Sequence, residues 1–305
     1  MVQSFDFMSD RLKTLRRQRI VVAAAHDDDV LRAVDRAFTL GICDPLLVGR
    51  KPDILKLLEK NHIAQYTYEI IDEPDDAKAC RLAVDIVRAG DARALMKGLV
   101  GTAVILRAIL DKNTGIRDRR LLSHIGLFFI PSLGRPLIIT DAAMSIAPDL
   151  ETKKHILENA VEAAHLMGIE NPHVACVAAL ETVNPKMPAT LDAEQIVAMN
   201  QQGLIAGCTV GGPLALDNAL FAEAARHKNI GGPVAGKADI LLMPNIESGN
   251  VLYKAISFLM ESPGAGIVLG ATAPVVLTSR SDHADTKLHS IALALYLASQ
   301  KGMNE

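Results

Sequence analysis

No long block of a single charge sign occurs in this sequence of 305 residues. Its 32 lysine and arginine residues and 35 aspartate and glutamate residues give a formal net charge of −3 at pH 7, and both signs are spread along the chain. Proteins that bind nucleic acid or an anionic membrane surface concentrate positive charge in patches. The charge pattern therefore argues against nucleic acid and membrane surfaces as general partners.

The sequence also lacks a long apolar run. The longest weakly polar stretch, 264–278, is interrupted by glycine and proline, and it is shorter than the roughly 20 apolar residues that a membrane-spanning helix needs. Near the N-terminus, the apolar run Ile20–Ala25 is short and is soon followed by three aspartates, unlike the pattern of a secretory signal peptide. We therefore expect no membrane span and a cytoplasmic location.

Cysteines are few and far apart. The four cysteines are Cys43, Cys80, Cys176 and Cys208. They form no C-x-x-C motif and no metal-type pairing with histidine. Paired spacings of that kind mark zinc and redox sites. Their absence, with largely apolar neighbours around each cysteine, predicts four buried free thiols in a reducing compartment.

Short apolar segments alternate along the chain with amphipathic segments, which predicts an α/β fold with a mainly parallel sheet. The expected strands cover 20–25, 45–48, 173–180, 238–243 and 266–277. The expected helices cover 30–40, 52–61, 151–167, 192–202, 250–260 and 285–299. Because no linker rich in glycine, serine or proline divides the chain, any two domains must share secondary structure.

Glycine and polar residues gather in five segments, which are 95–102, 181–188, 211–220, 234–254 and 275–285. In open α/β sheets, ligands bind beyond the carboxyl ends of the strands. These segments are therefore candidate binding loops, although each also fits an ordinary turn or the start of a helix.

The segment 95–102 combines a lysine, two glycines and a hydroxyl at the entry to a predicted helix. Lys97, Thr102 and, further along, Arg107 are its polar candidates. Backbone N–H groups at a helix start and a nearby cation suit a bound anion. The residue types therefore point to phosphate.

The segment 234–254 runs from a strand into a polar turn that opens a helix. The candidate residues there are Asn245, Ser248, Gly249, Asn250 and Lys254. A strand-to-helix turn of this composition suits a phosphate or an amide-rich ligand.

In the segment 275–285, a β-rich run delivers Ser279 and Arg280 to a strand end, and acids follow closely. A fixed guanidinium can hold a dianionic phosphate, and a hydroxyl can donate to developing negative charge. Asp282 and Asp285 could accept a proton or cap the following helix. Asp282 is nearer the turn and is expected to act as the cap, whereas Asp285 and His289 lie one helical turn apart and could interact.

Several long blocks of this sequence resemble the phosphate acetyltransferase and phosphate butyryltransferase family in the family's own order. They are 95–110, 139–161, 211–220, 234–256 and 275–295, and the similarity extends from about Ile20 to the end. The resemblance implies two α/β domains with a cleft between them, as in isocitrate and isopropylmalate dehydrogenases. We expect residues 1–140 and 277–305 in the first domain and 141–276 in the second, in a homodimer.

The resemblance also implies an activity. Such enzymes move a short acyl group, such as butyryl or acetyl, directly between the thiol of coenzyme A and inorganic phosphate, so the expected partners are CoA, acyl-CoA, acyl phosphate and phosphate. No metal or redox cofactor is expected. The family's Ser-Arg pair matches Ser279 and Arg280, and its anion-binding arginine matches Arg107.

Two positions depart from the acetyl-specific pattern. The aspartate that acetyl-specific members place seven residues after the serine is replaced here by Thr286, so the neighbouring Asp285 becomes the candidate base. Lys97-Gly98 stands where acetyl-specific members carry Ser-Gly, which favours the butyryl-type branch. The alternatives are a metal- and nicotinamide-dependent decarboxylating dehydrogenase of the same architecture and a non-catalytic regulator that binds CoA or phosphate.

Overall fold

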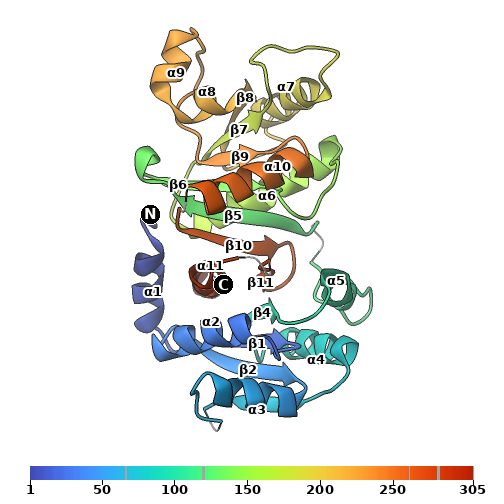
Figure 1. Cartoon of the computed structure of the whole chain (residues 1–305). Helices are drawn as coiled ribbons and strands as arrows, with labels where there is room; N and C mark the ends of the chain where they lie inside the picture. The colour runs from blue at the N-terminus through green and yellow to red at the C-terminus, as the bar shows by residue number, and fades with distance from the viewer. Residues whose placement is uncertain (66, 119–120, 261, 280–281, 305) are drawn as a thin grey trace. The chain divides into compact units, whose positions relative to one another are not determined.

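The computed structural model describes residues 1–65, 67–118, 121–260, 262–279 and 282–304 (Figure 1). The chain forms two compact units. We call residues 4–120 with 265–305 the terminal unit, and residues 1–3 with 121–264 the central unit. The expected domain boundaries after residues 140 and 276 stay a prediction.

The terminal unit contains strands in the order β3-β2-β1-β4-β11-β10. These are β1 (Gln18–Ala23), β2 (Cys43–Gly49), β3 (Glu69–Asp72), β4 (Ala94–Lys97), β10 (Gly264–Leu269) and β11 (Val275–Val276). Strands β1 to β4 and β11 run parallel to one another, and β10 is antiparallel to β11. The chain moves outward from β1 to β3 and then returns to β4 on the other side of β1. This reversal makes the carboxyl ends of β1 and β4 the topological switch point of the unit.

Six helices belong to the described part of this unit. They are α1 (Phe5–Lys13), α2 (Asp28–Thr39), α3 (Lys51–Lys60), α4 (Asp76–Arg88), α5 (Thr102–Ile109) and α11 (Ala284–Asn304). Helix α11 packs on α1 and α2, whereas α4 packs on α5 and β1. Aspartates begin two of them, because Asp27 accepts the Val30 N–H at the start of α2 and Asp75 accepts two N–H groups at the start of α4.

The central unit has the strand order β5-β6-β9-β7-β8. These are β5 (Ser123–Phe129), β6 (Pro136–Thr140), β7 (His173–Val177), β8 (Thr209–Leu214) and β9 (Ile240–Leu242). Strand β5 is antiparallel to β6, and the other pairs are parallel. The unit's helices are the 3-10 turn Pro131–Leu133, α6 (Leu150–Leu166), α7 (Pro188–Gln201), α8 (Leu216–Leu220), α9 (Ala222–His227), α10 (Ile246–Lys254) and the π-helical segment Ala255–Leu259.

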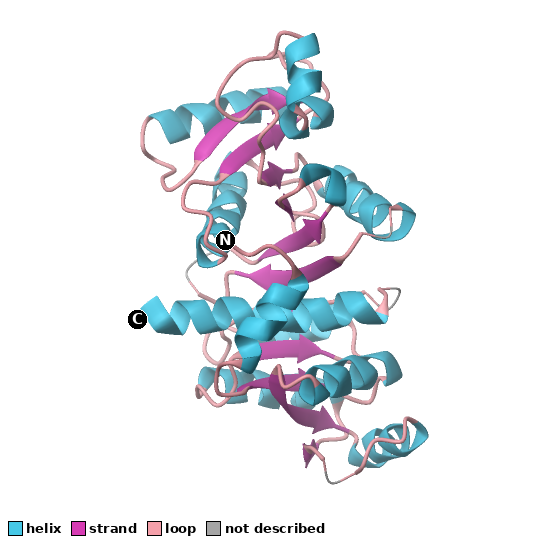
Figure 2. Cartoon of the chain, turned by 90° about the vertical axis from the view of Figure 1, so that its left-hand side faces the viewer, coloured by secondary structure: helices cyan, strands magenta, loops and turns pink. Residues whose placement is uncertain are grey.

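Helices pack along the strands in both units (Figure 2). The central core includes Phe128, Ile139, Leu241, Tyr253 and Ile256, all less than a tenth exposed. The predicted α/β class is confirmed. None of the helices in the described ranges is long and apolar enough to cross a membrane.

Two features of the sheet differ from the sequence-based expectation. Strands β3, β4, β5, β6 and β8 were not expected, and the predicted strand 266–277 consists of β10 and β11 with a turn between them. Gly270, in that turn, has a φ of 95°, a left-handed conformation that glycine adopts without a steric penalty. A continuous strand cannot pass through that conformation, so the chain reverses there.

The four cysteines are buried free thiols, as predicted. Burial raises the pKa of Cys80 to about 11, of Cys176 to about 12 and of Cys208 to about 11. These thiols are therefore protonated at neutral pH and are poor nucleophiles.

His26, which follows β1, is 4% exposed, and its Nε2 lies 2.6 Å from Nη2 of Arg50. Since a guanidinium can only donate, Nε2 must accept, and the imidazole is neutral. Burial first, and then the charge of Arg50, lower the pKa of His26 below 6.5, against the opposing effect of Asp76.

We predict that His26 makes the fold less stable in acid. The unfolded imidazole takes up a proton as the pH falls through about 6.5, while the folded one resists, so stability is lost below that pH. Denaturant unfolding from about pH 7.5 down to about pH 5 should show a smaller decline for His26→Gln than for the wild type, because only the latter carries this lowered pKa. His227→Gln, at an exposed site, controls for the loss of one imidazole. Equal declines in His26→Gln and the wild type would contradict the assignment.

Candidate functional site

The loops after β1 and β4 are joined by backbone hydrogen bonds. Gly98 donates to the carbonyl oxygen of Ala23, and Leu99 donates to that of Ala24, each at 2.8 Å. A Cβ at position 98 would lie 2.2 Å from the Ala24 oxygen, so only glycine fits this approach. The two loops therefore form one layer at the switch point of the terminal unit.

Lys97 lies in this layer and is 8% exposed. Its Nζ donates to the carbonyl oxygens of Gly98 at 3.1 Å and Val100 at 3.3 Å. The ammonium therefore shapes the loop that leads into α5. It also places a positive charge near the start of that helix, where N–H groups favour anions.

Thr102 and Arg107 stand at opposite ends of α5. Thr102 is the first residue of the helix and is exposed, and Arg107 belongs to its last turn and is also exposed. The structure therefore brings Lys97 and Thr102 to one loop and helix start, with Arg107 about 7.5 Å further along the helix axis. Their role in binding phosphate stays a prediction.

Ser279 reaches the same edge of the terminal unit through strand pairing. Strand β11 runs parallel to β4, with Val275 opposite Leu95 and Val276 opposite Met96. Because parallel strands end at the same edge, the residues after Val276 follow the course of Lys97 and its loop. Ser279 is exposed at the end of this segment, and Arg280 lies outside the described residues.

Asp285 and His289 occupy the first two turns of α11. The Asp285 carboxylate forms an ion pair with Arg36 of α2, and both side chains are more than half exposed. The His289 ring stacks on Phe5 of α1, with 4.1 Å between ring centroids. The packing of α11 against α1 and α2 therefore provides the Arg36 and Phe5 contacts of these two side chains.

The polar turn of the central unit forms the start of α10. Asn245 caps the helix, and its Oδ1 accepts the Ser248 N–H at 3.0 Å and the Ser248 hydroxyl at 2.7 Å. Asn250 donates to the Ala142 carbonyl oxygen at 3.1 Å. A Cβ on Gly249 would lie 2.5 Å from the backbone carbonyl oxygen of Asp141. The first turn of α10 is therefore fixed against the loop after β6.

Lys254 ends α10, about 13 Å from the helix start at 1.5 Å per residue. Its Nζ lies 5.5 Å from the centroid of the Phe258 ring. The structure thus brings four of the five candidate residues of segment 234–254 to the start of α10 and places Lys254 two turns away.

Asp141 was not among the predicted site residues, although it lies beside this turn at the end of β6. It is 3% exposed, and its Oδ1 accepts the N–H groups of Ala143 at 2.8 Å and Met144 at 2.9 Å. Within the described residues, its Oδ2 has no hydrogen-bond partner. In the sequence, only its position directly after a run of apolar residues indicates that Asp141 stands at the end of a buried strand.

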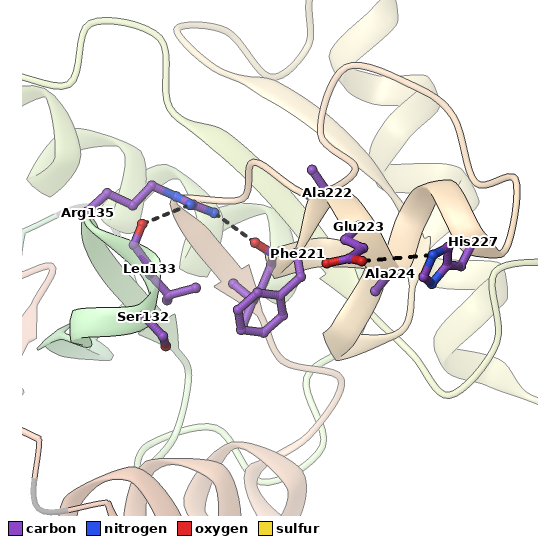
Figure 3. A pocket seen from close by; sticks show the side chains of 10 residues that line it. Ser132, Leu133, Arg135, Phe221, Ala222, Glu223, Ala224 and His227 are labelled. Atoms are coloured by element: carbon purple, nitrogen blue, oxygen red, sulfur yellow. Dashed lines mark hydrogen bonds and ion pairs between the residues drawn. The ribbon is translucent and has the colours of Figure 1, made fainter.

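A recess of about 600 Å³ opens elsewhere on the central unit, and none of the predicted site residues lines it (Figure 3). Arg135 is its main cation, but the guanidinium already donates to the carbonyl oxygens of Leu220 at 3.4 Å and Ala238 at 3.0 Å. The Glu223 carboxylate faces His227 at 4.0 Å on the exposed rim. The Arg135 guanidinium is therefore already hydrogen-bonded to backbone carbonyl oxygens. The candidate site stays with the segments described above.

We predict that Gly249→Ala destabilises the protein. The added methyl group would overlap the Asp141 oxygen and lie 3.1 Å from Cα of Ala142, so backbone must shift. Overpacking of this kind costs about 1 to 3 kcal/mol. Gly231→Ala is the matched control, because its Cβ would meet nothing within 4 Å. Urea unfolding measures the free energy of unfolding of both variants. Equal values would show that α10 does not depend on the close approach of Gly249 to the Asp141 carbonyl oxygen.

Comparison with known proteins gives the same family at the level of the whole chain. A family model described as phosphate acetyl/butaryl transferase matches residues 67–295. The chain is 46% identical to the phosphate butyryltransferase of Clostridium acetobutylicum over 301 residues, which cover 99% of this chain and 100% of that protein. It is 45% identical to the phosphate acetyltransferase of Thermotoga maritima over 281 residues, or 92% and 95% of the two chains.

Solved structures agree with these matches. A branched-chain phosphotransacylase from Enterococcus faecalis V583 superposes with a TM-score of 0.83 at 32% identity, covering 92% of this chain and 99% of that one. A phosphotransacetylase from Streptococcus pyogenes has the same fold, with a TM-score of 0.79 at 22% identity and coverage of 97% and 99%. The family match, the relatives and the fold lead to one conclusion: the chain belongs to the phosphate acetyl/butyryl transferase family.

Proposed function

We infer that the chain is a phosphate acyltransferase, an enzyme that moves a short acyl group between CoA and inorganic phosphate. The observation that carries this inference is the match over nearly the full length to a phosphate butyryltransferase and a phosphate acetyltransferase. A decarboxylating dehydrogenase is not favoured by these relatives. A cleft architecture of the isocitrate and isopropylmalate dehydrogenase type remains a proposal that rests on the resemblance.

In the direction from acyl phosphate to acyl-CoA, the first step is activation of the thiol. A thiol with a pKa of about 8.5 is only a few per cent ionised at neutral pH, so a base near it raises the reactive fraction. We assign that role to Asp285. The thiolate then attacks the acyl carbonyl carbon, the carbon–sulfur bond forms, and the carbon–oxygen bond to phosphate breaks.

Charge on the phosphate is the second requirement. Arg280, Arg107 and Lys97 would neutralise phosphate as it leaves, and Thr102 would donate a hydrogen bond to it. The position of Lys97 and Thr102 at the start of α5 supports this assignment, because N–H groups and a cation meet there. Ser279 would donate to the oxyanion of the tetrahedral intermediate.

CoA would bind to the central unit. The first turn of α10 offers the side chains of Asn245, Ser248 and Asn250 around Gly249, and Lys254 adds a cation at the other end of the helix. Amide and hydroxyl groups of this kind match the amide-rich arm of CoA, and a cation matches its phosphates. Holding the thiol near the acyl phosphate lowers the barrier by several kcal/mol through proximity alone, out of about 7 to 11 kcal/mol available in ideal cases.

Assembly and location are further proposals. We propose a homodimer in the cytoplasm. Four large apolar side chains of α10, the π-helical segment and the residue after it are 37% or more exposed, and they support an interface: Val251, Phe258, Leu259 and Met260. Sedimentation velocity of the purified protein measures the assembly.

The activity itself is tested by release of CoA thiol. The substrates are a series from acetyl-CoA to octanoyl-CoA, with and without inorganic phosphate, and a thiol reagent reports the product. We expect release that depends on phosphate and is fastest with a short chain. A protein that binds CoA but releases none from any substrate is a regulator instead.

We predict that Asp285→Asn lowers kcat by about 10²-fold, because an amide keeps the shape of the carboxylate but cannot accept the proton. The melting temperature should stay nearly unchanged, since an exposed ion pair such as Asp285 with Arg36 contributes about 0 to 1 kcal/mol. Steady-state kinetics and calorimetry measure the two quantities. A kcat within about threefold of the wild type would remove Asp285 from the proton transfer.

Chelation separates this function from its dehydrogenase alternative. We predict full activity after dialysis against EDTA and without nicotinamide, because arginine and lysine meet the phosphate charge in the proposed mechanism. Loss of activity that Mg²⁺ restores would favour a metal-dependent enzyme.

A further inference from the structure

The backbone of Ser279 is held by Asp282. The Ser279 N–H donates to Oδ2 of Asp282 at 2.7 Å, and the Asp282 N–H donates to the Ser279 carbonyl oxygen at 3.2 Å. Two hydrogen bonds in opposite directions therefore join these residues. A hydrogen bond to an ionised acceptor is stronger than one between neutral groups.

Lys287 holds Asp282 in turn. It lies in the first turns of α11, is 3% exposed, and donates from Nζ to the Asp282 carbonyl oxygen at 2.7 Å. A buried ammonium is costly unless it is hydrogen-bonded, so this contact strongly favours one arrangement. Helix α11 is itself packed on α1 and α2. The chain of contacts thus runs from this packed helix through Lys287 and Asp282 to Ser279.

The two acids of this segment differ in what they contact. Asp285 faces Arg36 on α2. Asp282 contacts the candidate serine, and among the described residues no donor reaches its Oδ1. Its carboxylate was expected to cap α11, yet the hydrogen bond that the structure gives it is directed backwards, to Ser279.

We propose that Asp282 and Lys287 are positioning residues for Ser279 in the acyl transfer. The proposal rests on the proposed function, in which the Ser279 hydroxyl donates to the developing oxyanion. Such a donor acts only within a few tenths of an ångström of its place, and a misplacement of about 1 Å can lower the rate about 10²-fold. Asp282 sets the backbone of Ser279, and Lys287 sets Asp282.

A double-mutant cycle tests whether Asp282 acts through Ser279. We expect Ser279→Ala to lower kcat about 10²-fold and Asp282→Ala to lower it about tenfold or more, with the KM values for CoA and phosphate within about twofold. In the Ser279→Ala background, Asp282→Ala should change kcat by less than about twofold, because its target is already absent. Losses that multiply would show an independent effect and overturn the proposal.

Conservative variants separate the hydrogen bond from the charge. Asp282→Asn keeps an oxygen that can accept the Ser279 N–H, so it should retain at least about a third of the kcat. Lys287→Met replaces the buried ammonium with an apolar chain and should lower kcat about fivefold or more. Asp149→Ala, which removes a similar carboxylate that caps α6 through the Thr152 N–H at 2.9 Å, is the control and should leave kcat unchanged.

Hydrogen exchange of the Ser279 amide gives a readout that needs no activity. The amide should be protected in the wild type and in Asp282→Asn and should exchange faster in Asp282→Ala. An unchanged exchange rate of the Ser279 amide in Asp282→Ala would overturn the positioning proposal, whether or not the wild type is active. A wild type that turns over no acyl-CoA would refute only the proposed function. Loss of kcat in Asp282→Asn with protection retained would assign the carboxylate a role in proton transfer and would also overturn positioning.

Discussion

The parallel pairing of β11 with β4 is the interaction on which the candidate site in the terminal unit depends. Strand β11 has only two residues, yet its register sets Val276 opposite Met96. It therefore brings Ser279 and Lys97, 182 positions apart in the sequence, to one edge of the sheet. The same edge carries the loop that Gly98 joins to β1. A shift of one residue in this register would turn the side chains of β11 to the opposite face and would displace Ser279 by about 3.3 Å in the strand direction.

Much of the fold could be predicted because alternating apolar and amphipathic segments are a local property. Strands β1, β2, β7 and β9 and the helix after the Asn245 turn follow from that alternation. Strands β3 to β6 and β8 and the break at Gly270 did not, because short strands and a left-handed glycine give too little periodic signal. The family resemblance, and not periodicity, predicts which of the polar segments bind substrate.

Side-chain partners were the least predictable feature. The spacing of Asp285 and His289 on one helix predicts a contact between these two side chains. In the structure, Asp285 forms an ion pair with Arg36, and the His289 ring stacks on Phe5. Both partners come from helices packed on α11, so tertiary neighbours displaced the local expectation. Asp282 illustrates the reverse case, since its contact with Ser279 is local, but a helix cap and a turn are equally compatible with the same sequence. Lys97 likewise uses its ammonium to shape its own loop as well as to bring positive charge to the helix start.

The central claim is that the acyl group passes to phosphate and not to water. The most direct measurement is ³¹P NMR of the wild-type protein with butyryl-CoA and inorganic phosphate, with released CoA followed in the same sample. The account predicts a new acyl phosphate signal that grows in equal amount to the CoA. Release of CoA with free butyrate and no acyl phosphate would contradict it, because the protein would then be a thioesterase.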